Sequence, residues 1–126
     1  MDTGRSQNIA GERSISKAFI ARYAAEAALR SEGVAGLEYT SVAALKERLG
    51  VSHDGRGVEV HFSNSGENLV CISVFPLVYY GFAIPEVAFS IQENVKSDLE
   101  KYTDLLVESV DVHVRDIIEI GEESHV

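Results

Sequence analysis

Two histidines and two carboxylates are the strongest candidates for chemistry in this chain. Glu59 and His61 alternate with apolar residues in one predicted strand, and Asp111 and His113 alternate with valines in a later one. If these two strands are neighbours, the four side chains could gather on one polar face and bind zinc or serve an enzyme. No pair has the spacing of a metal motif, so a solvated sheet face or a contact surface is the simpler interpretation. We therefore expect no metal, no cofactor and no catalytic residue.

The other residues with chemical potential are placed unfavourably. Cys71 is the only cysteine and lies in an apolar strand without a basic neighbour in sequence, which is typical of a buried, inert thiol. The segment Gly33-Val34-Ala35-Gly36 has the letters of the GxxG loop of KH-type RNA-binding domains, but its surroundings are apolar rather than basic. The sequence therefore favours a protein that is not an enzyme.

Composition narrows the class of protein further. The chain has 126 residues, a length that favours one domain, and a net charge of −9. Residues 58–126 hold thirteen Asp and Glu against three Lys and Arg, a surface that repels nucleic acid and anionic lipid. No apolar run approaches the roughly 20 residues that span a bilayer, and the N-terminus lacks a signal-peptide core. We expect a cytoplasmic protein that does not insert into membranes.

Two amphipathic helices must position these residues. The first begins near Ser16 and has a narrow stripe of small apolar residues: Ile20, Ala24, Ala27 and Ala28. Glycines at positions 33 and 36 should end it in a turn, and residues 41–49 are a shorter helix candidate. The long second helix opens at Pro85, and its stripe is Val87, Ile91, Val95, Leu99 and Tyr102. Phe89 lies off that stripe, on the charged side.

Three strands are predicted by alternating apolar residues, at 58–62, 69–79 and 107–117. The middle segment is apolar on both sides, with Val70, Ile72, Val74 and Val78 on one and Leu69, Cys71, Phe75, Leu77 and Tyr79 on the other. Pro76 lacks an N–H and marks a bulge or an unpaired position. The last strand should bury Val110, Val112 and Val114 and expose Ser109, Asp111, His113 and Arg115.

This order predicts an α+β fold, a two-layer sandwich in which a three-stranded mixed sheet carries helices mainly on one face. The elements follow as αββαβ, with the extra short helix after the first. The turn-rich residues 64–68 make the first two strands an antiparallel hairpin, and the right-handed crossover makes the last two parallel. Which strand lies in the middle is left open. Residues 1–13 are a flexible arm, 14–118 the domain, and 119–126 an acidic tail.

Several short motifs, taken in order, resemble the alkaline shock protein 23 family of bacteria, also called the general-stress Gls family. They are Ile15-Ser16, Gly33-Val34-Ala35-Gly36-Leu37, Gly57-Val58-Glu59-Val60, Tyr80-Gly81-Phe82-Ala83-Ile84-Pro85-Glu86-Val87-Ala88, Gln92, and Val110-Asp111-Val112-His113-Val114-Arg115-Asp116-Ile117. The chain departs from the family pattern at Asp104, where glycine is usual, and at Phe89, where a charged residue is usual.

The resemblance implies a non-enzymatic cytoplasmic protein of envelope stress. It implies either a partner that tethers it beneath the membrane or a role as regulatory partner of a lipid-synthesis enzyme. It brings no catalytic residue.

Apolar side chains without an evident cover predict self-association. Phe75, Leu77 and Tyr79 lie on the second face of a sheet for which the chain offers helices on one side, and Phe89 lies on a polar helix side. Exposed apolar patches of this kind mark contact sites. The alternative is that the 1–13 arm or the 41–49 helix covers this face. We expect a homo-oligomer whose interaction surface includes these four residues.

Overall fold

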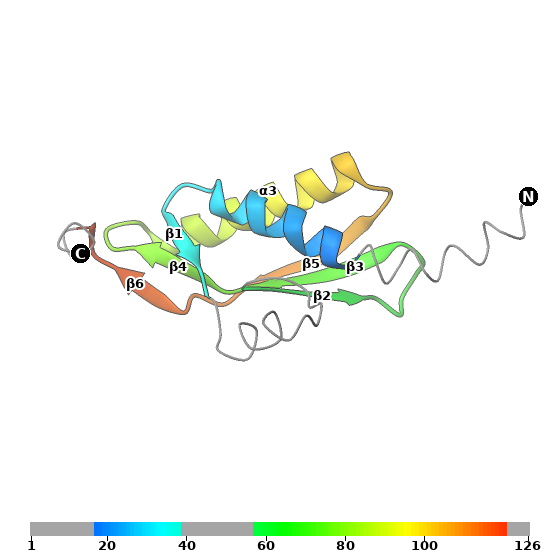
Figure 1. Cartoon of the computed structure of the whole chain (residues 1–126), viewed down its shortest axis with the longest axis horizontal. Coiled ribbons are helices and arrows are strands. Elements are labelled where there is room, and N and C mark those ends of the chain that lie inside the picture. The colour runs from blue at the N-terminus through cyan, green and yellow to red at the C-terminus, as the bar shows by residue number, and fades with distance from the viewer. Residues whose placement is uncertain (1–16, 39–56, 121–126) are drawn as a thin grey trace, which may run out of the picture.

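The computed structural model describes residues 17–38 and 57–120. A first helix over residues 17–29 is followed by β1 (Val34–Leu37), β2 (Val58–Phe62), β3 (Leu69–Val74), β4 (Pro76–Tyr79), α3 (Ile84–Tyr102), β5 (Leu106–Val112) and β6 (Asp116–Ile118). Both helices lie on the same side of the strands (Figure 1). This confirms the two-layer α+β architecture with helices on one face. The predicted arm, the 41–49 helix and residues 121–126 of the tail lie outside the described residues.

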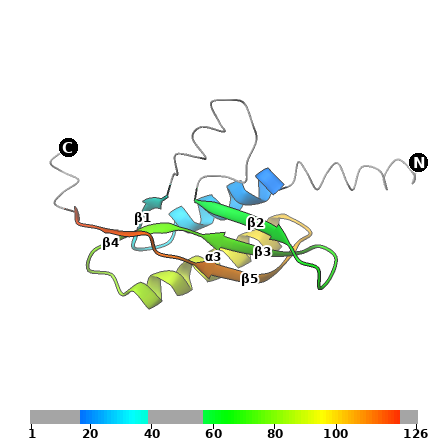
Figure 2. The same ribbon diagram turned by 90° about the horizontal axis from the view of Figure 1, so that it is seen from below.

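The strands form two three-stranded sheets, in the orders β2-β3-β5 and β1-β4-β6. β2 and β3 pair antiparallel, and β3 and β5 pair parallel, as the hairpin and the crossover predicted. β4 likewise pairs antiparallel with β1 and parallel with β6. The segment of β3 followed by β4, here called the central strand, therefore lies in the middle of both sheets, with β5 and β6 along one edge (Figure 2).

The strands divide into two sheets at Pro76, the residue that the sequence marked as a bulge or an unpaired position. The Phe75 amide donates to the Gly57 carbonyl at 2.9 Å, while the Pro76 carbonyl accepts from the Arg115 amide at 2.9 Å. Backbone groups alternate in direction along a strand, so the Pro76 nitrogen faces the β5–β6 side and has no hydrogen to donate there. The central strand breaks at Phe75, and the strand beside it breaks at residues 113–115.

A further strand, β1, forms where the sequence predicted only a turn. Gly33 does turn the chain, with φ at +91°, but residues 34–37 then pair with β4. The Tyr79 amide donates to the Gly33 carbonyl at 2.9 Å and starts this pairing. The ladder is irregular between Val34 and Gly36, as expected of a strand with glycine inside it. Pairing with a neighbouring strand here outweighs the local preference of glycine for turns.

The core lies between the sheets and the two helices, as the period-two and period-3.6 patterns predicted. Its fully buried members include Ile20, Ala24, Ala27, Ala28, Ile72, Val74, Ile91, Val95 and Leu99. Val110 is also buried, and Val112 and Val114 are partly buried against the same cluster. The alanine stripe of the first helix lets its backbone lie close to its neighbours, since alanine adds only one methyl group.

Polar links between the two helices hold the helical layer together. The Arg30 guanidinium donates to both carboxylate oxygens of Asp98, at 2.9 and 3.1 Å. The hydrogen bond to Asp98, together with its charge, raises the pKa of Arg30. The Asn94 amide donates to the Ser31 hydroxyl at 2.9 Å, and that hydroxyl donates to the Ala27 carbonyl at 3.0 Å. These bonds fix the register of the first helix against α3.

Candidate interaction surfaces

The four polar candidates share one sheet face but do not meet. The register aligns Glu59 with Ser73 in β3, and Ser73 with Asp111 in β5. Neighbouring strands lie about 4.8 Å apart, so Glu59 and Asp111 are separated by roughly 10 Å, with Ser73 between them. The structure does not place β2 and β5 side by side, which was the condition under which the four candidates could have formed an ion site.

Each histidine has a local neighbour instead. The His61 Nε2 lies 3.8 Å from the Glu59 Oε1, and both side chains are exposed. The His113 ring stacks on Phe75 with centroids 5.2 Å apart. Within residues 17–38 and 57–120, no three His, Cys, Asp or Glu side chains gather in a way that could hold a metal ion.

The thiol of Cys71 lies on the same face and is half-buried rather than buried. Its Sγ lies 3.4 Å from the Glu108 Oε1. Reactive cysteines sit beside a cationic group or a helix N-terminus that favours the thiolate, and a carboxylate is neither. This arrangement resembles a structural thiol.

The outer face, meaning the side of both sheets away from the helices, carries the predicted apolar line. Phe75, Leu77 and Tyr79 point to this face and are half-buried. No helix in the described part of the chain packs on it (Figure 2). The Arg115 guanidinium lies 5.4 Å from the centre of the Phe75 ring and donates to Glu38 at 2.9 Å. The Phe75 ring at the centre of this face is thus covered in part by the Arg115 guanidinium and by the His113 imidazole.

Phe89 does not belong to this line. It lies on α3, in the layer on the opposite side of the sheets, and is 62% exposed. Because the sheets lie between them, the four predicted interaction residues form two separate surfaces. Phe89 is three residues before Gln92 and so lies on the same side of the helix, one turn away.

Side chains from α3 cap the backbone of the edge strand β5. The Gln92 amide donates to the Val110 carbonyl at 3.0 Å, and the Glu100 carboxylate accepts from the Val107 amide at 2.9 Å. An edge strand with open backbone groups is a template for pairing with another chain, so these contacts protect it. The sequence pointed to Gln92 only as part of a motif and gave no signal for Glu100, since both roles depend on the packing of helix against strand.

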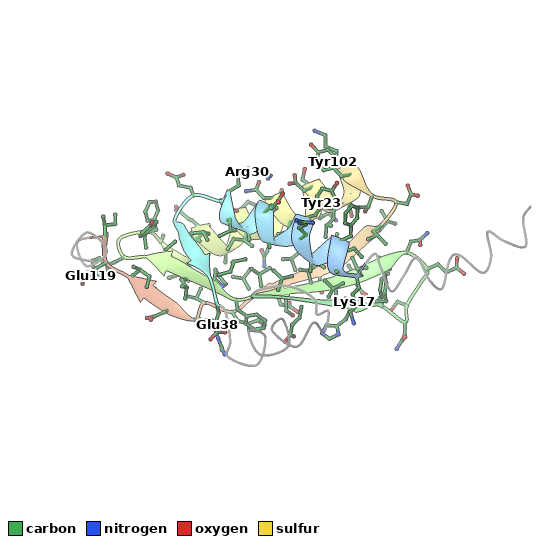
Figure 3. The ribbon with its side chains drawn as sticks, in the orientation of Figure 1. Lys17, Tyr23, Arg30, Glu38, Tyr102 and Glu119 are labelled. Atoms are coloured by element: carbon green, nitrogen blue, oxygen red, sulfur yellow. The ribbon has the colours of Figure 1, made fainter. Side chains whose placement is uncertain are left out.

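An aromatic cluster at the far end of the helical layer was also missed. Tyr23 of the first helix and Tyr102 of α3 stack their rings on each other, with centroids 5.7 Å apart (Figure 3). Phe19 meets Tyr23 edge-on at 5.6 Å. The pattern had assigned Tyr102 to the buried stripe of α3, but it is the last residue of the helix and is 55% exposed.

Comparisons with known proteins agree with the motifs. Residues 5–119 match the model of the alkaline shock protein 23 family, which is described as having a cell envelope-related function. The uncharacterized protein YqhY of Bacillus subtilis is 33% identical over 88 residues, which are 70% of this chain and 63% of that protein. The uncharacterized protein YloU of the same organism is 32% identical over 109 residues, 85% of this chain and 88% of that one. No solved structure matches the chain.

The family match spans nearly the whole chain, whereas the matched region of YqhY is less than two thirds of that protein. None of the helices described in residues 17–38 and 57–120 is long and apolar enough to cross a membrane. The match, the two-layer fold and the motifs lead to one conclusion: this chain belongs to the alkaline shock protein 23 family of cell envelope-related proteins.

Proposed function

We propose that this protein is a non-enzymatic cytoplasmic factor of cell-envelope homeostasis under stress, which acts through self-association and contacts with other proteins. Its partner is a membrane-anchored protein that holds it at the inner side of the membrane. The family description supports the envelope-related part of this proposal. The role as regulatory partner of a lipid-synthesis enzyme rests on the resemblance alone, and no feature of the described residues favours it.

The outer face is the observation that carries the proposal of self-association. Phe75, Leu77 and Tyr79 form a continuous half-buried line there. Two copies that pack these lines together would remove the remaining apolar surface from water, which stabilises association by about 25 cal/mol for each Å². The same face carries Glu59 and Asp111 at its borders, so opposing copies would also repel each other, and the association should strengthen with salt.

Light scattering coupled to size-exclusion chromatography tests this proposal over a range of protein concentrations and salt. We expect an oligomer that Phe75→Glu shifts towards monomer while the circular-dichroism spectrum is retained. Phe19→Glu is the matched control, because Phe19 is an exposed aromatic residue in the helical layer and its replacement should leave the oligomer intact. A wild-type protein that stays monomeric at every concentration would refute self-association.

A further inference from the structure

The edge formed by β5 and β6 is capped along only part of its length. Gln92 and Glu100 satisfy backbone groups of Val110 and Val107, but the edge continues to Ile118. The His113 amide donates to the Val74 carbonyl at 2.8 Å, and the Arg115 amide donates to the Pro76 carbonyl. Backbone direction alternates along a strand, so the amides of Val112 and Val114 point away from the sheet. We call residues 112–118 the open edge. Its open groups are the Val112 and Val114 amides, because the Ile117 amide donates to the Asp116 Oδ1 at 2.8 Å.

No partner for these two outward amides is found among the described residues. In the neighbouring segment 107–110, by contrast, the side chains of Gln92 and Glu100 from α3 bind the outward backbone groups. The cover ends where the helix turns carry alanine and phenylalanine at positions 88 and 89 in place of polar capping groups. The open edge is therefore the part of the sheet on which a further strand could pair.

Phe89 lies beside the open edge. α3 runs antiparallel to β5, because Gln92 contacts Val110 while the later Glu100 contacts the earlier Val107. One helical turn is about 5.4 Å and one strand residue about 3.3 Å, so the turn before Gln92 lies near Val112. Figure 2 shows the first turns of α3 next to this edge. The helical turn that carries the exposed Phe89 thus lies near the helix side of the open edge.

The two sides of the open edge differ in chemistry. On the helix side, Phe89 is 62% exposed and Ile117 is 41% exposed, and Ile117 pairs with the inward-facing Val78. On the outer side, Asp111 and Asp116 are exposed carboxylates. Arg115 offers little cationic charge there, because its guanidinium is bound to Glu38 and lies over Phe75. An added strand would meet an apolar shelf on one side and acidic groups on the other.

We propose that the open edge binds an extended segment of another protein in which apolar and basic side chains alternate. The segment adds a strand beside Val112 and Val114, places its apolar side chains against Phe89 and Ile117, and places its basic side chains beside Asp111 and Asp116. Alternation follows from the pleat, because successive side chains of a strand point to opposite faces. A second copy of this chain fits less well, since each copy has a net charge of −9. This inference rests on the proposed role in protein contacts and gives the partner its chemistry.

A short peptide that alternates valine and lysine is the probe, and nuclear magnetic resonance shifts of the full-length protein are the readout. We expect shifts in residues 112–118 and at Phe89, weaker binding at high salt, and no binding of a peptide that alternates valine and glutamate. Methylation of the backbone nitrogens on one side of the valine–lysine peptide should abolish binding, because it removes the strand hydrogen bonds.

Phe89→Ser should weaken binding about tenfold, the size of loss expected when an exposed aromatic anchor is removed. Phe19→Ser, at the other end of the helical layer, should leave it unchanged. Val114→Pro removes one outward amide and should also reduce binding. If the Val114→Pro variant does not fold, Phe89→Ser still tests the proposal, because Phe89 is exposed and its replacement should not disturb folding.

The proposal is overturned by an absence of valine–lysine binding, by equal binding of the valine–glutamate peptide, or by shifts confined to the outer face. It is also overturned if, without peptide, the amides of Val112 and Val114 become protected as concentration rises, because a second copy would then be the occupant. Peptide binding by a strictly monomeric protein would refute self-association and leave the edge proposal standing. An oligomer that Phe75→Glu dissociates but that does not bind the valine–lysine peptide would support self-association and refute the edge proposal.

Discussion

Gly33 and Gly81 are a matched pair that tests how tightly the turn before β1 packs against Phe82 and Val87. Both have positive φ angles, +91° and +102°, so alanine at either position must adopt a strained backbone, at a cost of about 1–2 kcal/mol. Their surroundings differ. A Cβ at Gly33 would lie 2.8 Å from the Val87 Cγ2 and 3.0 Å from the Phe82 Cγ, whereas a Cβ at Gly81 has nothing within 4 Å. Gly33→Ala therefore adds overcrowding to strain.

Val87 cannot move away easily, because it is 3% exposed and lies in the first turn of α3. Overcrowding in a packed region costs about 1–3 kcal/mol beyond the strain. We expect Gly81→Ala to lower the free energy of unfolding by about 1–2 kcal/mol and Gly33→Ala by about 2–5 kcal/mol. For a domain of this size 1 kcal/mol shifts the melting temperature by about 4–8 °C, so the two variants should differ by roughly 10 °C.

Urea unfolding followed by far-ultraviolet circular dichroism gives both free energies, and the difference between the variants isolates the contact with Val87 and Phe82. Equal destabilisation by the two substitutions would refute the close approach of Gly33 to Val87 and Phe82. If Gly33→Ala leaves the free energy of unfolding unchanged, the positive φ angle of Gly33 is refuted as well.

Three further outcomes are expected. Ile91→Ala should reduce the free energy of unfolding by about 2–5 kcal/mol, because it leaves a cavity in the fully buried core; urea unfolding measures this, and a loss below 1 kcal/mol would contradict the core assignment. Gln92→Leu should cost about 1–3 kcal/mol, since the Val110 carbonyl loses its partner; a loss no greater than that of Glu93→Leu, at the next and exposed position, would dismiss the cap. Added zinc should leave the melting temperature unchanged by scanning calorimetry, because Glu59 and Asp111 lie on opposite sides of β3; a concentration-dependent rise would contradict this.

Local patterns in the sequence determined which side chains face the core. The alternation along residues 69–79 predicted that Ile72 and Val74 point inward and Phe75 and Leu77 outward, and the structure agrees, because side-chain direction in a strand depends only on the pleat. The helix stripe of Ile91, Val95 and Leu99 was predictable for the same kind of reason. Hairpin and crossover geometry likewise settled which pairs are antiparallel and which parallel.

The order of the strands was decided only by tertiary structure. Glu59 and Asp111 occupy equivalent outward positions in either order, so nothing in their spacing reveals that β3 separates them. The glycine-containing segment after Gly33 became β1 because β4 offers it a ladder, an energy that local propensity does not contain. The capped and open parts of the β5–β6 edge were hidden for a related reason. Whether Gln92 reaches Val110 depends on how a helix packs on a strand 18 residues further along the chain.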